Sequence, residues 1–319
     1  MRLFIFGIGY TAQALIATQT HRFSHIAGTV RTAEKAQALR ARGIDAHVFD
    51  GADSRKPAEP ALLRALESAD TLLAGIPPGE AGDPALALLT GTDTPAAPEA
   101  TESQRLFRFR EIGKRINHIG YLSTIGVYGD HGGAWVDETS LTLTRLPRSL
   151  RRLDAEAAWL ALARSAGARP FVFRLPGIYG PGRNNLRDLA AGTARNIVKA
   201  GHVFNRAHVD DIAAAIAAAM AQDGPEGVYN VTDDEPAAQG DVVAFAARLL
   251  GVPPPQPVDI ATARLPETVR SFHVENKRVS NARLKALPGF RLAYPTYREG
   301  LAALHALGEG SAIAGTDSR

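Results

Sequence analysis

The feature that most constrains the fold is a short apolar run near the N-terminus that ends in two glycines. Residues 3–6 are all apolar, Gly7-Ile8-Gly9 closes the run, and residues 12–18 then repeat apolar positions at helical spacing. A continuously apolar run of this length predicts a strand buried on both faces. The glycines permit a sharp turn, so we expect a buried strand, a tight turn and a helix.

The same alternation continues through the first half of the chain. Five further short apolar runs are expected to be buried strands, at residues 26–30, 46–49, 71–76, 119–123 and 171–175. Helical stretches separate them, for example at 33–42 and 154–165. This order predicts an α/β protein with a Rossmann-type, doubly wound parallel sheet, because right-handed crossovers leave few other topologies.

The pattern becomes less regular after residue 180. We expect a Rossmann domain over 1–180, a smaller mixed C-terminal substrate lobe over 181–307 with segments that return to the main sheet, and a flexible tail over 308–319. The length of 319 residues fits this division, since single cores stop growing at about 250–300 residues. The segment 78–100, rich in Pro, Gly and Ala, is also expected to be mobile.

Composition excludes several classes of protein. The chain has no cysteine, which excludes disulfides, thiolate chemistry and cysteine-ligated metals. Its 36 basic and 33 acidic residues are interspersed, unlike the clustered charge of a nucleic-acid binder. No apolar run reaches membrane length and residues 1–9 show no leader pattern, so we expect a cytoplasmic protein without a membrane partner. No His/Asp/Glu set has metal-ligand spacing, so we expect no metal.

Residues 145–152 form the densest basic stretch, with four Arg in eight positions. The simpler interpretation is a solvated helix start, and the alternative is a site for an anion.

The glycine turn has the residues that a dinucleotide site requires. Gly7 permits the tight turn, Gly9 lets the backbone approach a pyrophosphate, and the small Ala12 allows the helix to pack closely on the strand. The helix N-terminus then presents free N–H groups to the phosphates. The alternative is a glycine turn that serves packing alone.

The end of the second predicted strand bears on which dinucleotide binds. NAD sites usually place a carboxylate there for the ribose 2′-hydroxyl, whereas this chain has Arg31-Thr32 and no carboxylate until Glu34. A guanidinium can pair with a 2′-phosphate. We therefore expect NADP, with NAD as the alternative.

Four later motifs add to this pattern. They are Leu-Ser-Thr-Ile-Gly-Val-Tyr-Gly at 122–129, Arg-Leu-Pro-Gly-Ile-Tyr-Gly-Pro-Gly at 174–182, His-Val-Asp-Asp at 208–211 and Asn-Lys-Arg-Val-Ser-Asn at 276–281. With the glycine turn, they make the chain resemble the extended short-chain dehydrogenase/reductase family, the group of nucleotide-sugar epimerases and dehydratases. The resemblance runs nearly end to end and implies an NAD(P)-dependent oxidoreductase or epimerase/dehydratase-like enzyme. It also implies a small-molecule substrate, such as a nucleotide-sugar or another anionic compound, and leaves a homodimer open.

The resemblance assigns candidate binding residues. For the cofactor they are Gly7, Gly9, Tyr10, Thr11, Ala12, Arg31, Thr32, Asp50, Ala74, Gly75, Ile76, Thr124, Arg152, Leu175, Pro176 and Gly177. For the substrate they are Tyr179, Arg183, Arg206 and His208. Simpler roles compete for some of them: Tyr179 could pack under a loop, His208 could belong to a helix start, and solvated surface charge explains the arginines equally well.

The chain departs from the family at its catalytic residues. The family uses a Ser or Thr, a Tyr, and a Lys four residues after that Tyr. Thr124 matches the first and Glu156 matches an acidic residue four beyond the Lys, which places Arg148 at the Tyr position and Arg152 at the Lys position. A guanidinium stays protonated and cannot shuttle a proton near neutral pH. In this respect the chain resembles an atypical branch of the family that lacks the active-site Tyr.

Two functional hypotheses remain. The first is an NADP-dependent oxidoreductase or epimerase-like enzyme with a non-standard acid/base group, with Thr124, Tyr128 and Arg152 as candidate catalytic residues. Packing is the competing role for Tyr128, and Arg152 could hold the nicotinamide ribose. The second is a non-catalytic NADP-binding sensor or regulatory protein.

Overall fold

The computed structural model describes residues 1–51, 59–91, 115–221 and 224–311, which form two compact units. Unit 1 comprises Met1–Thr124, Arg145–Arg174 and Ala213–Tyr229. Unit 2 comprises Ile125–Thr144, Leu175–Ile212 and Asn230–Arg319. Parts of the two segments expected to be mobile, residues 92–100 and 312–319, lie outside the described residues.

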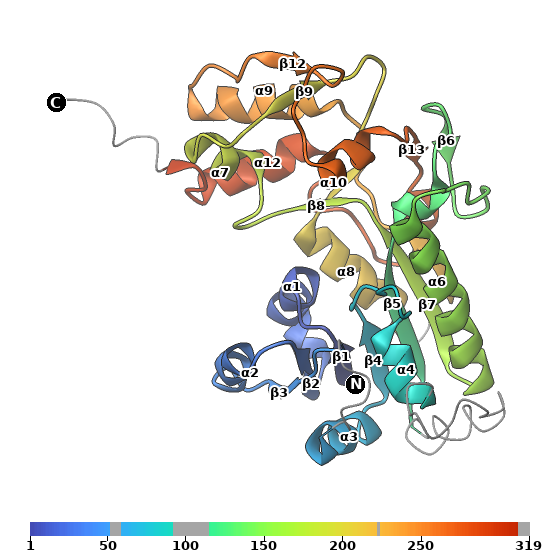
Figure 1. Cartoon of the computed structure of the whole chain (residues 1–319). Coiled ribbons are helices and arrows are strands. Elements are labelled where there is room, and N and C mark those ends of the chain that lie inside the picture. The colour runs from blue at the N-terminus through green and yellow to red at the C-terminus, as the bar shows by residue number, and fades with distance from the viewer. Residues whose placement is uncertain (52–58, 92–114, 222–223, 312–319) are drawn as a thin grey trace. The chain divides into compact units, whose positions relative to one another are not determined.

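Unit 1 is built on a seven-stranded sheet with the order β11-β7-β5-β4-β1-β2-β3 (Figure 1). The strands are β1 (Arg2–Phe6), β2 (His25–Val30), β3 (Asp45–Val48), β4 (Thr71–Ala74), β5 (His118–Thr124), β7 (Arg169–Leu175) and β11 (Gly227–Asn230). The ladders that join β3 to β2, β2 to β1, β1 to β4 and β4 to β5 are parallel. The chain winds outward from β1 in both directions, which confirms the predicted α/β Rossmann-type fold.

Several helices that pack on this sheet begin at a proline or at a capping side chain. The helices are α1 (Tyr10–Gln19), α2 (Ala33–Arg40), α3 (Pro60–Glu67), α4 (Pro84–Thr90) and α6 (Pro147–Ser165), and α8 (Val209–Ala219) crosses from unit 2 into unit 1. Proline occupies the first turn of α3, α4 and α6, where its missing N–H costs no hydrogen bond. The Asp83 carboxylate caps α4 by accepting from the Ala85 and Leu86 amides.

The core of unit 1 lies along the apolar strands. Leu3, Phe4, Ile5 and Phe6 of β1 are each at most 2% exposed. On the side of α6, the Trp159 ring stacks on Tyr121 of β5 with 6.2 Å between ring centroids. Figure 1 shows α6 running beside β5 and β7.

Unit 2 contains three short parallel strand pairs. They are β8 (Gly177–Tyr179) with β10 (Arg206–His208), β9 (Asn196–Val198) with β12 (Pro257–Asp259), and β6 (Trp135–Val136) with β13 (Arg278–Val279). Its helices are α7 (Asn185–Ala190), α9 (Gln239–Leu250), α10 (Glu267–Arg270), α11 (Ala282–Lys285) and α12 (Tyr297–Ala306). Apolar residues of α7, α9 and α12 form its core. In the described ranges, no helix combines the length and apolarity needed to cross a membrane.

Gly28 lets β2 approach β1 at the centre of the sheet. It pairs with Ile5, and a Cβ added at Gly28 would lie 2.5 Å from the Ile5 carbonyl oxygen and 2.9 Å from Ile8 Cδ1. The first of these atoms is backbone and cannot rotate away. A side chain at this position would therefore separate the two strands that carry the glycine turn.

We expect Gly28→Ala to lower the free energy of unfolding by about 1–3 kcal/mol, the usual cost of overpacking a core. Gly79→Ala is the matched control, because a Cβ at Gly79 meets no atom within 4 Å. Urea unfolding followed by far-UV circular dichroism measures both. Equal effects of the two substitutions would contradict the close approach of β1 and β2.

Candidate functional site

The glycine turn joins β1 to α1 at the point where the sheet changes winding direction. Gly7 has φ +85°, a conformation that favours glycine, and a Cβ there would lie 2.8 Å from Ile76 Cγ1. The Gly7 amide donates to Thr29 Oγ1 at 2.9 Å, and the Ile8 amide donates to the Thr29 carbonyl oxygen at 2.8 Å. The turn is therefore fastened to β2 and packed against the residues that follow β4.

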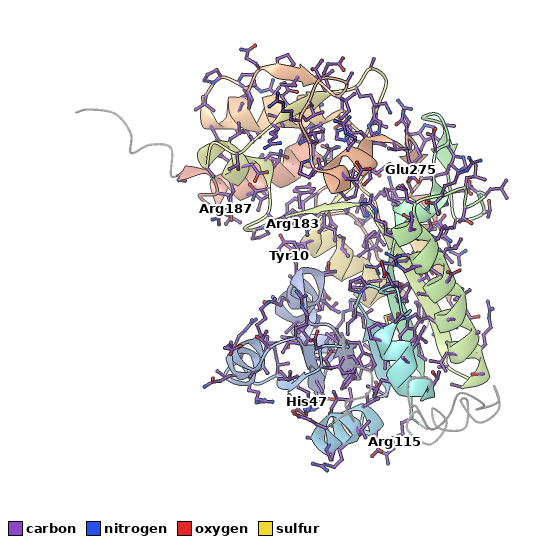
Figure 2. All side chains as sticks on the ribbon, in the orientation of Figure 1. Tyr10, His47, Arg115, Arg183, Arg187 and Glu275 are labelled. Atoms are coloured by element: carbon purple, nitrogen blue, oxygen red, sulfur yellow. The ribbon has the colours of Figure 1, made fainter. Side chains whose placement is uncertain are left out.

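The start of α1 leaves backbone donors available. Gly9 is its N-cap and supplies no side-chain hydrogen bond, and the space around Gly9 is open, since a Cβ there would meet only the Gly7 carbonyl oxygen at 4.0 Å. Neither the Thr11 nor the Ala12 amide meets an acceptor among the residues that the structure describes. Ala12 is buried, so the helix packs closely on the sheet. Such a turn can receive a diphosphate on backbone amides. Tyr10, labelled in Figure 2, lies at the first position of α1.

Arg31 follows β2 directly and is exposed, with no ion pair to any described residue. Thr32 is the N-cap of α2, where its hydroxyl accepts from the Lys35 amide. Glu34 follows on the first turn of α2, and hydrogen bonds to its own backbone and to Thr32 lower its pKa. Along the chain after β2, the Arg31 guanidinium therefore comes before the first carboxylate, that of Glu34.

The other candidate cofactor residues of unit 1 lie after β3 and β4. Asp50 is exposed, two residues beyond β3. Ala74 ends β4 and is fully buried, whereas Gly75 and Ile76 are half-buried. The Gly75 amide donates to the Phe6 carbonyl oxygen, which holds this segment beside the glycine turn.

Arg152 lies on α6 and reaches the carboxyl end of β5. Its Nη1 atom donates to the Leu122 carbonyl oxygen at 2.6 Å and to the Tyr121 hydroxyl at 3.3 Å. Thr124, half-exposed, is the last residue of β5. Tyr121 is fully buried, and burial raises its pKa to about 12, so this phenol keeps its proton near neutral pH.

A buried polar cluster fixes α6 to the sheet. Glu156 accepts from the Ser123 hydroxyl at 2.5 Å and from Arg174 Nη2 at 2.8 Å, and all three residues are at most 6% exposed. A second link joins Trp159 Nε1 to the Asp83 carboxylate at 2.8 Å, and burial raises the pKa of Asp83. Glu156 stood out in the sequence only by its position in a motif, and Asp83 and Arg174 carried no sequence signal for these contacts.

In unit 2, Tyr128 is fully buried and its hydroxyl donates to Asn230 Oδ1 at 2.8 Å. Leu175 is buried, Pro176 is half-buried, and Gly177 is exposed at the start of β8. Tyr128 thus has the packed, hydrogen-bonded arrangement that the sequence analysis named as the alternative to a catalytic role.

The candidate substrate residues of unit 2 have different exposures. Tyr179 is buried, and its hydroxyl donates to the Thr296 carbonyl oxygen at 3.4 Å. Arg206 is buried and donates to two backbone carbonyls, of Phe204 and Ala237, and to Gln239. Arg183 is exposed in the loop before α7 (Figure 2).

His208 is buried between two tyrosine rings, 5.2 Å from the centroid of Tyr179 and 4.0 Å from that of Tyr294. Its Nδ1 atom accepts from the Asp210 amide, and burial lowers its pKa. Its Nε2 atom is buried and meets no hydrogen-bond partner among the residues that the structure describes. The imidazole is therefore held neutral within unit 2.

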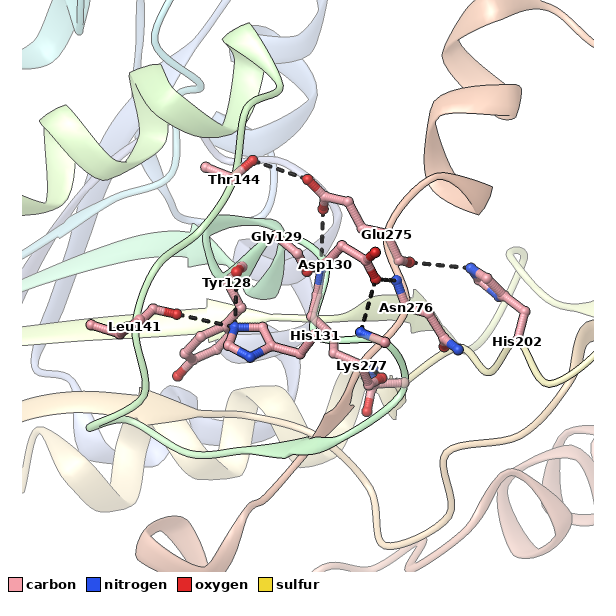
Figure 3. A network of polar contacts seen from close by, with 12 residues as sticks. Tyr128, Gly129, Asp130, His131, Leu141, Thr144, His202, Glu275, Asn276 and Lys277 are labelled. Carbon is pink, nitrogen blue, oxygen red and sulfur yellow. Dashed lines mark hydrogen bonds and ion pairs between the residues drawn. The ribbon is translucent and has the colours of Figure 1, made fainter.

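A further polar network joins two loops of unit 2 (Figure 3). The Asp130 carboxylate accepts from the amides of Gly132 and Asn276, and hydrogen bonds to these amides lower its pKa. Glu275 accepts from Thr144 and from Lys277, whose Nζ atom also donates to the Gly129 carbonyl oxygen. These contacts tie the loop after β5 to the segment before β13. Over the described ranges, no three His, Asp or Glu side chains converge as metal ligands would.

No protein-family model matches the chain. A functionally unknown conserved protein from Silicibacter pomeroyi is 41% identical, covers 97% of this chain and 99% of its own, and superposes with a TM-score of 0.80. The chain belongs to the family of this Silicibacter protein. Protein YeeZ of Escherichia coli (strain K12) is 29% identical over 260 residues, which are 79% of this chain and 85% of YeeZ.

Other similarities connect the fold to nucleotide-dependent enzymes. A provisionally assigned NAD-dependent epimerase/dehydratase from Methylobacillus flagellatus is 25% identical with a TM-score of 0.63, covering 96% of this chain and 98% of its own. A 3-diazoavenalumate denitrifying reductase from a Streptomyces species is 32% identical over 150 residues, 44% of this chain and 48% of the reductase. UDP-glucuronic acid 4-epimerase from Bacillus cereus, solved with NAD, shares the fold at 16% identity and a TM-score of 0.69, covering 98% of this chain and 96% of its own. The chain therefore has the fold of the NAD-dependent epimerase/dehydratase, or extended short-chain dehydrogenase/reductase, proteins.

We expect Glu156→Gln to destabilise unit 1 by about 3–5 kcal/mol, because the buried Arg174 charge loses its counter-ion. Glu235→Gln is the control, since Glu235 pairs with Arg298 at the surface and such pairs contribute at most about 1 kcal/mol. Urea unfolding compares the two variants. A loss at Glu156 no larger than the loss at Glu235 would contradict the role of the buried pair.

The buried Asp233 of unit 2 gives a pH prediction. Burial raises its pKa to about 8, so the folded state binds a proton more tightly than the unfolded state. The contribution of the Asp233 carboxyl group to the stability of the folded state is therefore complete below about pH 4 and disappears as pH rises through about 8. Thermal unfolding at pH 5 and pH 8 should therefore show a smaller loss of stability for Asp233→Asn than for the unsubstituted protein. Asp241→Asn removes an exposed carboxylate and is the control: it should lose as much stability between pH 5 and pH 8 as the unsubstituted protein does. The same loss in Asp233→Asn as in the unsubstituted protein would refute the prediction.

Proposed function

We propose that the protein binds NADP through unit 1 and is an NADP-dependent oxidoreductase or epimerase-like enzyme of the atypical short-chain dehydrogenase/reductase branch. The observation that carries this proposal is the glycine turn at the winding reversal of the sheet, where α1 opens with two amides that no described acceptor satisfies. Open parallel sheets bind ligands at this position. Structures that share the fold at lower identity were solved with NAD or with NADPH, as in human epimerase family protein SDR39U1.

The residues of unit 1 suit such a cofactor. The amides of Thr11 and Ala12, with the open backbone at Gly9, would receive the pyrophosphate. Arg31, exposed and without an ion pair to a described residue, would receive the 2′-phosphate. Arg152, fixed at the end of β5, would hold the nicotinamide ribose. The bound cofactor would supply hydride transfer.

The reaction must proceed without the usual phenol and ammonium pair. The Thr124 hydroxyl would hydrogen-bond a substrate oxygen, since it ends β5 beside the Arg152 anchor. Arg148 and Arg152 can orient or neutralise charge but cannot exchange protons near pH 7.

The replacement of the catalytic Tyr and Lys by Arg148 and Arg152 favours a second candidate, a non-catalytic NADP-binding sensor or regulator. NADPH oxidation, followed at 340 nm with a panel of carbonyl compounds and nucleotide-sugars, separates the two. Turnover that Thr124→Ala abolishes supports the enzyme. NADPH binding without turnover on any substrate supports the sensor.

We expect NADPH to bind at least about tenfold more tightly than NADH, because a charge-assisted pair with the 2′-phosphate contributes about 1.5–3 kcal/mol. Arg31→Ala should remove this preference while leaving NADH affinity unchanged. Arg42→Ala, an exposed arginine just beyond α2, is the control and should alter neither affinity. Titrations followed by the fluorescence of the reduced nicotinamide measure the affinity of all three proteins for NADPH and NADH. Equal affinity for the two cofactors in the unsubstituted protein would overturn the choice of NADP.

A further inference from the structure

The hydroxyl group of Tyr121 is a polar group inside an apolar core. Tyr121, on β5, is fully buried and belongs to the same cluster as Phe6 and Trp159. A buried hydroxyl group costs free energy unless it has a hydrogen-bond partner. In the part of the chain that the structure describes, that partner is the Arg152 guanidinium, whose Nη1 atom donates to the hydroxyl oxygen at 3.3 Å. A phenylalanine would fill the same space, so what the hydroxyl adds is the contact with Arg152.

Tyr121 contacts Arg152 in a second way, through its ring. The central carbon of the Arg152 guanidinium lies 5.8 Å from the centroid of the Tyr121 ring, within the range in which an aromatic face attracts a cation. The other hydrogen bond that Arg152 makes to a described residue goes to the backbone, at the Leu122 carbonyl oxygen. Tyr121 is therefore the side chain that limits where this guanidinium can lie.

The Tyr121 ring is itself held in place by Trp159 of α6. The two rings stack with their centroids 6.2 Å apart and their planes 20° apart. Trp159 Nε1 donates to the Asp83 carboxylate at 2.8 Å, and Asp83 also accepts from two amides in the first turn of α4. A chain of packed and hydrogen-bonded groups therefore runs from the start of α4 to the Arg152 guanidinium.

The strand register places Tyr121 level with the glycine turn. Tyr121 pairs with Ala74 of β4, and Ala74 pairs with Phe6, the last residue of β1 before the turn. Neighbouring strands lie about 4.8 Å apart, so Tyr121 is about 10 Å across the sheet from the start of the turn. Arg152 bonds to the next carbonyl group along β5. The guanidinium is thus held at the carboxyl end of the strand, where parallel sheets bind their ligands.

An arginine that binds a ligand gains affinity when it is held in place beforehand. The long side chain has many rotamers, and ordering it only when the ligand arrives reduces the affinity. Arg152 has donors left for a ligand, since its Nε and Nη2 atoms make no hydrogen bond to a described residue and are not fully buried. The contacts with Tyr121 and the Leu122 carbonyl group therefore fix the guanidinium without using all of its N–H groups.

We propose that Tyr121 is a positioning residue for the cofactor, which holds the Arg152 guanidinium at the place where the nicotinamide ribose would bind. The inference rests on the proposed function, which assigns the ribose to Arg152. Because Tyr121 is fully buried, it acts through Arg152 and does not itself reach the cofactor.

Two ligands separate this role from a purely structural one. NADPH carries the nicotinamide ribose, whereas adenosine 2′,5′-bisphosphate carries only the adenosine half of the cofactor. Tyr121→Phe should weaken NADPH binding about three- to tenfold, the loss expected for one hydrogen bond, and leave the affinity for adenosine 2′,5′-bisphosphate within about twofold. Isothermal titration calorimetry of the full chain measures both. Equal weakening of the two ligands would overturn the positioning role, because a general disturbance of unit 1 affects both halves of the cofactor.

Tyr229→Phe is the matched control. Tyr229 is a buried tyrosine on β11 of the same sheet, and its hydroxyl donates to the Pro225 carbonyl oxygen instead of contacting Arg152. This variant should bind both ligands as the unsubstituted protein does. A loss of NADPH affinity as large as that in Tyr121→Phe would show that any buried phenol has the same effect, and would refute the proposal.

A double-mutant cycle tests whether the effect passes through Arg152. Arg152→Met removes the donors and should itself weaken NADPH binding, and adding Tyr121→Phe should then weaken it no further. Additive losses would contradict the proposal. Failure of the unsubstituted protein to bind NADPH overturns the proposed function and this inference with it, whereas NADPH binding that Tyr121→Phe leaves unchanged counts against the positioning role alone.

Discussion

The centre of unit 1 depends on the buried hydrogen bonds and ion pair that the Glu156 carboxylate makes. The carboxylate connects α6 to β5 through Ser123 and to β7 through Arg174, where almost no water reaches. A buried charge persists only while its counter-ion and hydrogen bonds stay in place, so these three elements hold one another in register. Because Arg152 lies one turn before Glu156, the same contacts set the height at which its guanidinium meets the Leu122 carbonyl group.

The strands could be predicted because a parallel sheet buries both of its faces. The apolar runs at 3–6 and 26–30 correspond to β1 and β2, which extend only one residue further at their N-terminal ends. Strand ends were harder to place. The run 71–76 stays apolar, yet β4 stops at Ala74, opposite Phe6, the last residue of β1. A strand ends where its neighbour stops pairing, and apolarity alone does not record that.

The candidate site was predictable where its chemistry is local. A glycine turn and the residue after the second strand depend on a few consecutive positions, so Gly7, Gly9 and Arg31 could be selected directly. Contacts between distant segments could not be foreseen, such as that of Asp83 with Trp159, 76 positions apart. Nor does sequence show how donors are used: Arg206 and Arg183 are both single basic residues, yet one satisfies carbonyls in the interior and the other reaches solvent.

The discontinuity of unit 1 has a consequence for biosynthesis. Its third stretch, Ala213–Tyr229, supplies most of β11, the edge strand beside β7. During translation the ribosome must therefore extrude more than two thirds of the polypeptide before this sheet can be completed. Until then β7 presents an unpaired edge, a surface that invites aggregation. The edge of β7 is therefore open to pairing with other chains during the interval between the emergence of β7 and that of β11.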